Sequence, residues 1–135
     1  VLALLERADF NNRQLASLYL DQGFIAGNGN YLRSEILFFA GVNPRLKPRE
    51  LTPPARKKLA ENTLSISQRS YRTGGITLPA SMTPKDTKSG RRYYERDRFA
   101  VFARDGKPCR ICRTPIKKAV VTSRRIYWCP ECQPA

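Results

Sequence analysis

The chain has 135 residues, which is room for one ordinary domain or two small ones. Its 25 lysine and arginine residues outnumber 11 aspartate and glutamate residues, and the formal net charge at pH 7 is +14. The sequence contains no histidine, which excludes Ser–His–Asp triads, histidine-containing zinc sites and imidazole acid–base catalysis. No apolar run reaches membrane-spanning length, and the apolar residues 1–5 are too few for a signal sequence.

The positive charge is concentrated in the larger, C-terminal part of the sequence. Residues 1–43 carry slightly more acidic than basic side chains, so the whole excess lies in residues 44–135. A basic region of this size favours nucleic acid as the partner, through neutralisation of phosphates and release of counterions. An anionic membrane surface is the competing partner, but no long amphipathic basic helix supports it.

The first elements expected in chain order are helices. Residues 1–7 indicate the end of a helix, and a chain that starts inside such a pattern without Met is expected to be a fragment. Asn11 or Asn12 is expected to cap a second helix, which ends at Gly23.

A turn sequence over residues 24–30, with Gly27 and Gly29, leads into the next helix, which is expected over residues 31–40 and ends at Gly41. Its expected buried face consists of Leu32, Ile36, Phe39 and Ala40. The free N–H groups of its first turn and the positive end of its dipole form an anion site, for which DNA phosphate is a natural occupant. Gly29 and Asn30 are the residues expected to contact it. The alternative is that Asn30 only caps its own helix.

Thr52, followed by Pro53 at the first helical position, predicts a helix that runs to about Ser70. The side chains expected to face inward are Leu59, Thr63 and Ile66, with Leu64 at the edge of that face.

Residues 73–92 are rich in glycine, proline, serine and lysine and offer little to bury. We expect a long mobile loop there. Tyr94, Phe99 and Phe102 then predict a short helix that ends at Asp105.

The only cysteines form two CxxC pairs, Cys109 with Cys112 and Cys129 with Cys132. A two-residue gap lets a tight turn point both sulfurs at one ion, and two such turns complete the tetrahedron that Zn²⁺ prefers with thiolates. Four thiolates leave no open coordination position, so we expect one structural zinc. The intervening residues suffice for two short strands whose turn lies away from the metal. The alternative is two disulfides, with three possible pairings.

Arg124 and Arg125 lie near that turn. Two adjacent guanidinium groups on a metal-stiffened turn suit a phosphate, and a solvated turn is the alternative. Together with the anion site at Asn30, they predict two phosphate sites that grip one DNA backbone. Such contacts give affinity without much base reading.

These motifs together resemble the formamidopyrimidine-DNA glycosylase/endonuclease VIII family of bacterial repair enzymes, and most of all its endonuclease VIII members. The resemblance depends on residues 21–23, the turn at 27–31 with Glu35 after it, and the finger over residues 109–133. It covers essentially the whole chain.

The resemblance implies a mainly α fold with a small β zinc finger. A helix–two-turn–helix domain is expected over residues 1–92, including the mobile loop at about 73–92. A short helix and the four-cysteine zinc finger are expected over residues 93–135. With two such subdomains, loss of one zinc ligand is expected to unfold the finger and spare the helices.

The resemblance also implies a parent enzyme, a bifunctional DNA glycosylase/AP lyase that removes oxidised bases and nicks the strand by β,δ-elimination. In such enzymes the asparagine matching Asn30 binds a backbone phosphate at the lesion. The arginine matching Arg124 binds phosphate and acts as proton donor in δ-elimination, and the loop matching residues 73–92 lies over the flipped base in some members. The expected partner is double-stranded DNA with oxidised or abasic sites, bound by a monomer in the bacterial cytoplasm at the nucleoid.

Two features depart from the family pattern. The family begins with Pro-Glu, whose proline amine is the nucleophile, whereas this sequence begins Val1-Leu2. We therefore expect the N-terminal catalytic domain to be missing and the chain alone to be inactive. The finger arginine is usually followed by a small residue or proline, and here Arg125 follows Arg124.

Two other functions compete with the repair enzyme. One is a stand-alone zinc-containing module that binds RNA or the ribosome. The other is a purely structural zinc module in a larger assembly.

Overall fold

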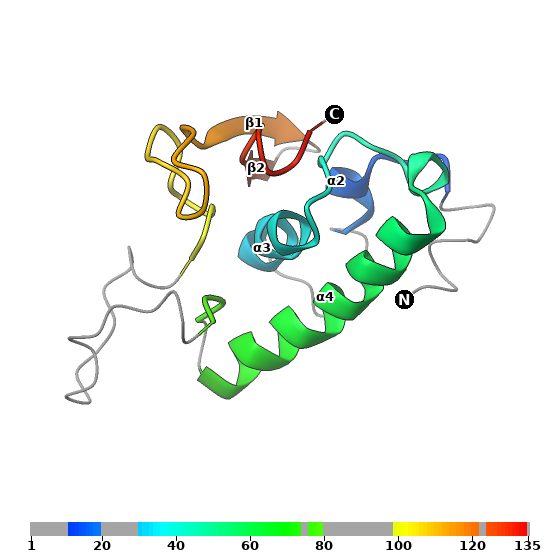
Figure 1. Ribbon diagram of the computed structural model, residues 1–135, viewed down its shortest axis with the longest axis horizontal. Helices are drawn as coiled ribbons and strands as arrows, with labels where there is room; N and C mark the ends of the chain where they lie inside the picture. Colours follow the sequence, from blue (N-terminus) through cyan, green and yellow to red (C-terminus); the bar gives the residue numbers. More distant parts are fainter. Residues whose placement is uncertain (1–10, 20–29, 74–75, 80–98, 122–123, 135) are drawn as a thin grey trace.

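The computed structural model describes residues 11–19, 30–73, 76–79, 99–121 and 124–134. The elements are α2 (Leu15–Leu18), α3 (Asn30–Ala40), the 3-10 helix η1 (Pro48–Glu50), α4 (Pro53–Thr73), β1 (Lys117–Val121) and β2 (Arg124–Trp128). Figure 1 shows α3 between the β1–β2 hairpin and α4. The predicted class, mainly α with a small β hairpin, is confirmed.

Helix α3 is buried on nearly all sides. Leu32, Ile36 and Ala40 are buried as predicted, and Phe39 is half-buried. The sequence indicated one apolar face, but the buried part of the helix is wider, because the hairpin covers one side of it and α4 covers another. The further buried side chains are Arg33, Ser34, Glu35, Leu37 and Phe38.

Helix α4 starts at Pro53 as predicted, and the Ala55 N–H donates to Thr52 Oγ1 at 3.3 Å, which confirms the cap. The helix continues past Ser70 to Thr73. Leu64 is 60% exposed, so its placement at the edge of the inward face was wrong. The side chains confirmed as inward are Leu59, Thr63 and Ile66.

Helix α2 is anchored by backbone contacts rather than by an asparagine cap. Its N-cap residue is Gln14, whose side chain makes no capping hydrogen bond, so the prediction of Asn11 or Asn12 was wrong. The Leu15 N–H donates to the Leu46 carbonyl at 2.8 Å, and the Ala16 N–H donates to the Pro44 carbonyl at 2.9 Å. These carbonyls satisfy the donors that a side-chain cap would otherwise serve. The predicted helix over residues 1–7, the helix end at Gly23 and the turn at residues 27–29 lie outside the described residues.

The described part of the predicted helix around Phe99 and Phe102 forms turns instead, so that prediction was wrong there. The N–H groups of Ala100, Val101 and Phe102 donate to the Glu35 carboxylate at 2.7, 2.8 and 3.1 Å. Ala103 follows with a φ of 59°, which stops a right-handed helix. Tyr94 lies outside the described residues.

Of the predicted loop over residues 73–92, the structure describes Thr73, which ends α4, and residues 76–79. Thr77 and Leu78 are buried, so this part contributes to the core, contrary to the expectation of little to bury. Residues 80–92 lie outside the description, and the loop's mobility stays a prediction.

Two apolar clusters join the finger to the helices. The first contains side chains of α2, α3 and α4 together with Ile126 and Trp128 of β2. The second joins Phe38 of α3 to Tyr127, Cys109 and Cys129. The predicted boundary between residues 92 and 93 lies outside the described residues, so the division into 1–92 and 93–135 stays a prediction.

The hairpin strands pair antiparallel. Val121 lies opposite Arg124 next to the turn, and Lys117 lies opposite Trp128, the residue before Cys129. The turn is therefore at the end of the hairpin away from the cysteines, as predicted.

None of the helices in the part of the chain that the structure describes combines the length and apolar character that crossing a bilayer requires.

Glu35 is a fully buried carboxylate that fastens two segments to α3. Besides the three N–H groups of residues 100–102, the Thr77 hydroxyl donates to it. Burial raises the pKa of Glu35, and these hydrogen bonds act in the opposite direction.

We expect Glu35→Gln to lower the free energy of unfolding by about 2–4 kcal/mol, because an amide donor would replace one accepting oxygen and leave buried N–H groups unpaired. Urea denaturation measures this. Glu61→Gln on the exposed side of α4 is the matched control and should change stability by less than about 0.5 kcal/mol. Equal stability of the two variants would contradict the anchoring role.

Candidate functional site

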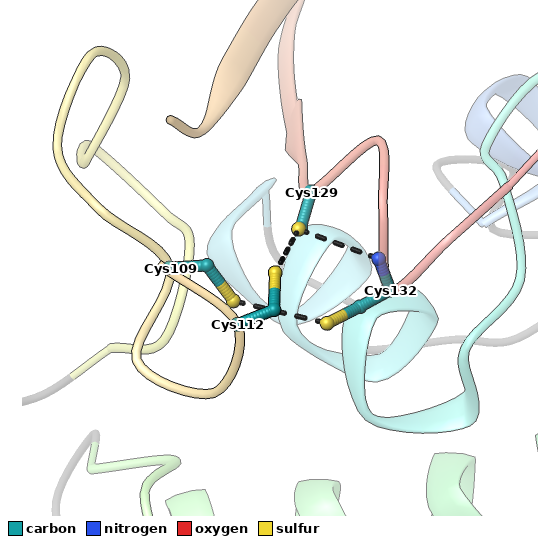
Figure 2. A group of neighbouring side chains, drawn as sticks. All are labelled: Cys109, Cys112, Cys129 and Cys132. Atoms are coloured by element: carbon teal, nitrogen blue, oxygen red, sulfur yellow. Dashed lines mark hydrogen bonds between the residues drawn. The ribbon is translucent and has the colours of Figure 1, made fainter. Parts of the chain in front are cut away.

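The four cysteines converge on one point (Figure 2). Their Sγ atoms all lie within 4.8 Å of one another. The Cys109–Cys132 and Cys112–Cys129 sulfur pairs are 3.8 and 3.4 Å apart. A tetrahedron with Zn–S bonds of about 2.3 Å has edges of about 3.8 Å, whereas a disulfide bond is about 2.05 Å. The four thiols are free, and the cluster can hold a metal ion, so the disulfide alternative is not favoured.

Each CxxC turn has an internal hydrogen bond to the sulfur of its first cysteine. The Ile111 N–H donates to Cys109 Sγ, and the Cys132 N–H donates to Cys129 Sγ, both at 3.4 Å. N–H groups directed at a sulfur stabilise its thiolate form, which is the form that binds metal.

The thiols differ in acidity. Hydrogen bonds with Thr114 lower the pKa of Cys112 to about 6. Burial raises the pKa of Cys129 and of Cys132. A metal bound here would displace protons from the last two, and its affinity would fall as the pH is lowered. With all four ligands supplied by the protein, such a metal would join the two turns and leave no position for a substrate.

Gln133 fixes the second CxxC turn to the end of α3. Its side chain accepts from the Cys129 N–H and donates to the Val42 carbonyl, both at 2.9 Å. Its own carbonyl accepts from the Asn43 side chain at 3.0 Å. Gly41, with a φ of 72°, brings this junction close to the Cys132 carbonyl. The metal-binding turn is thus held directly against the C-terminal end of α3.

The first turn of α3 is held against β2 in the same way. Buried Arg33 donates from Nη1 to the Ala16 carbonyl at 2.6 Å and from Nη2 to the Arg125 carbonyl at 2.8 Å. The Tyr127 N–H donates to the Ser34 hydroxyl at 3.1 Å. Helix α3 therefore positions both ends of the finger, the metal-binding turn and the strand that carries the paired arginines.

Arg124 and Arg125 lie on opposite faces of the hairpin, because side chains alternate along a strand. Arg124 shares the face of Ile126 and Trp128, which pack on the helices. Burial lowers the pKa of Arg33 to about 10, and the positive charge of Arg124 acts in the same direction. Arg125 lies opposite Val120, which is 70% exposed on the outer face.

The structure thus joins the first turn of α3 to the start of β2, the strand that begins with Arg124. Asn30 begins α3, but its side chain and Gly29 are not among the described positions. Their predicted phosphate contacts therefore stay predictions.

Sequence reasoning missed Arg33 and the anchoring role of Gln133. The signal for Arg33 was a lone cation between Leu32 and the apolar run from Ile36, inside a helix that proves to be buried all round. No local signal marks the anchoring role of Gln133, because its partners at the end of α3, Val42 and Asn43, are about ninety residues away in sequence.

Helices packed around a central helix, with a four-cysteine finger held against that helix, define a class of helical proteins with a finger that can hold a metal ion. The chain belongs to the formamidopyrimidine-DNA glycosylase H2TH domain family, which matches residues 2–81. The resemblance inferred from the sequence is thereby confirmed.

Individual relatives agree with this assignment. The chain is 43% identical over 133 residues to Endonuclease 8 of Klebsiella pneumoniae, covering 98% of this chain and 47% of the relative. It is 42% identical over 124 residues to Endonuclease 8 of an Escherichia coli K12 strain, covering 92% and 43%. The chain spans about half the length of the curated relatives that it matches.

Solved structures share the fold. The MutM (Fpg) protein of Thermus thermophilus superposes with a TM-score of 0.74 at 32% identity, covering 97% of this chain and 47% of that one. The Lactococcus lactis Fpg, solved with an abasic site containing DNA, gives a TM-score of 0.76 at 22% identity over 100% of this chain and 48% of that one. This second likeness shows the fold alone.

Proposed function

We propose that this chain is the DNA-binding half of a base-excision-repair DNA glycosylase/AP lyase that acts on oxidised bases. One observation carries the proposal: Arg33 ties the first turn of α3 to β2 beside Arg124. The first turn of α3 and the start of β2, two elements suited to phosphate, are thereby held together, which supports a pair of neighbouring anion sites. A rigid pair of anion sites suits a polymer of regularly spaced phosphates.

The proposed contacts follow from charge and position. Backbone N–H groups at the start of α3, with Gly29 and Asn30, bind one phosphate of the damaged strand, and Arg124 binds its neighbour. The buried charge of Arg33 adds positive potential between them. Arg125 makes a supplementary contact from the outer face. In the complete enzyme Arg124 is also the proton donor of δ-elimination, as the family resemblance implies.

The metal proposed for the cysteine cluster is one structural Zn²⁺ per chain, held by Cys109, Cys112, Cys129 and Cys132. The sulfur spacing and the all-thiolate ligand set support zinc over harder cations. The metal contributes by stiffening the finger that carries Arg124.

Base removal is proposed for the parent protein and not for an isolated polypeptide of these 135 residues. A polypeptide of these 135 residues would begin with Val1-Leu2, whereas the resemblance assigns the nucleophile and the proton carrier to an N-terminal Pro-Glu pair. Incubation with abasic DNA and borohydride should therefore trap no covalent complex. A trapped complex would show that this chain carries its own nucleophile.

A binding competition tests the DNA-binding proposal. The chain should bind a duplex with an abasic-site analogue more tightly than a structured RNA of equal charge, measured by fluorescence anisotropy over a range of salt concentrations. Preference for the RNA would favour the stand-alone RNA or ribosome module. Weak binding to both at low salt would favour the purely structural zinc module. A monomer at the nucleoid in the bacterial cytoplasm is the setting that the DNA-repair proposal implies.

A further inference from the structure

A second group of cations lies beside the proposed phosphate site and has no assigned role. It comprises Arg45, Lys47, Arg49, Lys57 and Lys58, here called the basic strip. Lys47 is half-buried, and the other four are exposed. Among the described residues none of the five forms an ion pair. The only acidic residue in the sequence from 45 to 58 is Glu50, whose carboxylate accepts a hydrogen bond from the Lys47 N–H at 2.9 Å.

Local contacts hold the strip together. Arg56 Nε donates to the Pro48 carbonyl at 3.2 Å, which fastens η1 to the first turn of α4. The Arg45 guanidinium lies 5.4 Å from the centre of the Trp128 ring, which ties the other end of the strip to β2. The start of α4 is not itself an anion site, because Pro53 and Pro54 lack N–H groups and the Ala55 N–H is used by Thr52. The attraction for an anion therefore comes from the side chains.

Helix α2 lies beside α3 (Figure 1), and hydrogen bonds join it to Arg33 of α3 and to Pro44 and Leu46, which flank Arg45 of the strip. Arg33 donates to the Ala16 carbonyl at 2.6 Å, and the Ala16 N–H donates in turn to the Pro44 carbonyl at 2.9 Å. One helical turn thus separates the two positive regions. A helix with side chains is about 10 Å wide, which corresponds to about three base pairs at 3.4 Å per base pair.

We propose that the basic strip is a second phosphate-binding surface, which follows the same DNA duplex outward from the lesion. This inference rests on the proposed function. Like charges crowded without counterions repel one another, and a row of duplex phosphates relieves that repulsion while adding affinity for any sequence. The strip would lengthen the bound stretch of DNA by about three base pairs on one side of the damaged nucleotide.

The test compares two triple variants of the full chain. Arg49→Gln/Lys57→Gln/Lys58→Gln removes three charges of the strip. Arg72→Gln/Lys107→Gln/Arg113→Gln removes three exposed charges elsewhere and is the matched control. Binding to an abasic-analogue duplex of about 30 base pairs is measured against salt. The strip variant should flatten the log–log salt slope by up to about 2.7, at about 0.9 per phosphate, and the control should not.

Truncated duplexes locate the contact. Two shortened duplexes are used, each with about two base pairs left on one side of the analogue, one for each side. The duplex that lacks the side contacted by the strip should bind the wild type and the strip variant with equal affinity. Equal losses for the strip variant and the control on the long duplex would overturn the proposal. If those losses are equal while the wild-type chain still binds with a steep salt dependence and Arg124→Ala still weakens binding, only the strip is overturned. A wild-type chain without salt-dependent binding overturns the proposed function itself.

Discussion

Replacing Cys129 with serine is expected to abolish metal binding and to unfold the finger. Cys129 is buried at the end of β2, and its Sγ lies 3.4 Å from that of Cys112. A three-thiolate site binds zinc far more weakly, and zinc held by four cysteines contributes roughly 10–16 kcal/mol of apparent binding free energy to folding. The variant should contain less than one zinc per chain by metal analysis, where the wild type contains one.

The structure changes what this substitution is expected to do to the helices. From the sequence alone the helices were expected to be spared. Ile126 and Trp128 of β2 pack in the same apolar cluster as Leu59 and Ile66 of α4. Unfolding the hairpin would expose that cluster, so the thermal midpoint followed by the helical circular dichroism signal should fall as well.

Ile111→Ser is the matched control for the zinc experiment. Ile111 lies between the ligands Cys109 and Cys112 and is 62% exposed, so its loss removes no sulfur and little packing. It should retain one zinc per chain. Retention of a full zinc by Cys129→Ser would remove Cys129 from the ligand set. An unchanged thermal midpoint would instead show that finger and helices fold independently.

The elements that were predicted correctly are determined by residues close to them in the sequence. Thr52 and Pro53 place the start of α4 by capping and φ restriction alone, and the two CxxC turns bring their sulfurs together through a two-residue spacing. The elements predicted badly depend on distant partners. The carbonyls of Pro44 and Leu46 take the place of an asparagine cap on α2, and the Glu35 carboxylate binds N–H groups across a gap of 65 residues and more.

The residues of the candidate site also differ in whether nearby sequence or distant partners determine their positions. The cluster of four cysteines that can hold a metal ion could be predicted from spacing and residue type. Which arginine faces the helices could not, because it depends on the strand register and on which hairpin face packs against α3. Arg33 is the clearest case in which local sequence does not predict the structure. Its side chain is buried because α2 and β2 pack over it, and the residues next to it in the sequence indicate neither contact.

Arg124→Ala is expected to weaken DNA binding about tenfold at roughly 0.1 M salt and to flatten the log–log salt slope by about 0.9, as loss of one phosphate contact requires. Anisotropy titrations of an abasic-analogue duplex at several salt concentrations give both quantities. The fold should be unchanged, because Arg124 is exposed.

Arg125→Ala is the decisive comparison, since it removes the same charge one residue away. The backbone carbonyl of Arg125 that binds Arg33 is retained in this variant, so α3 and β2 stay joined. With its side chain on the outer face beside Val120, Arg125 should contribute less to affinity than Arg124. Equal losses for both variants would mean that only net charge matters. A larger loss for Arg125→Ala would place the DNA on the outer face of the hairpin, away from the start of α3, and the two phosphate sites would no longer act on one strand.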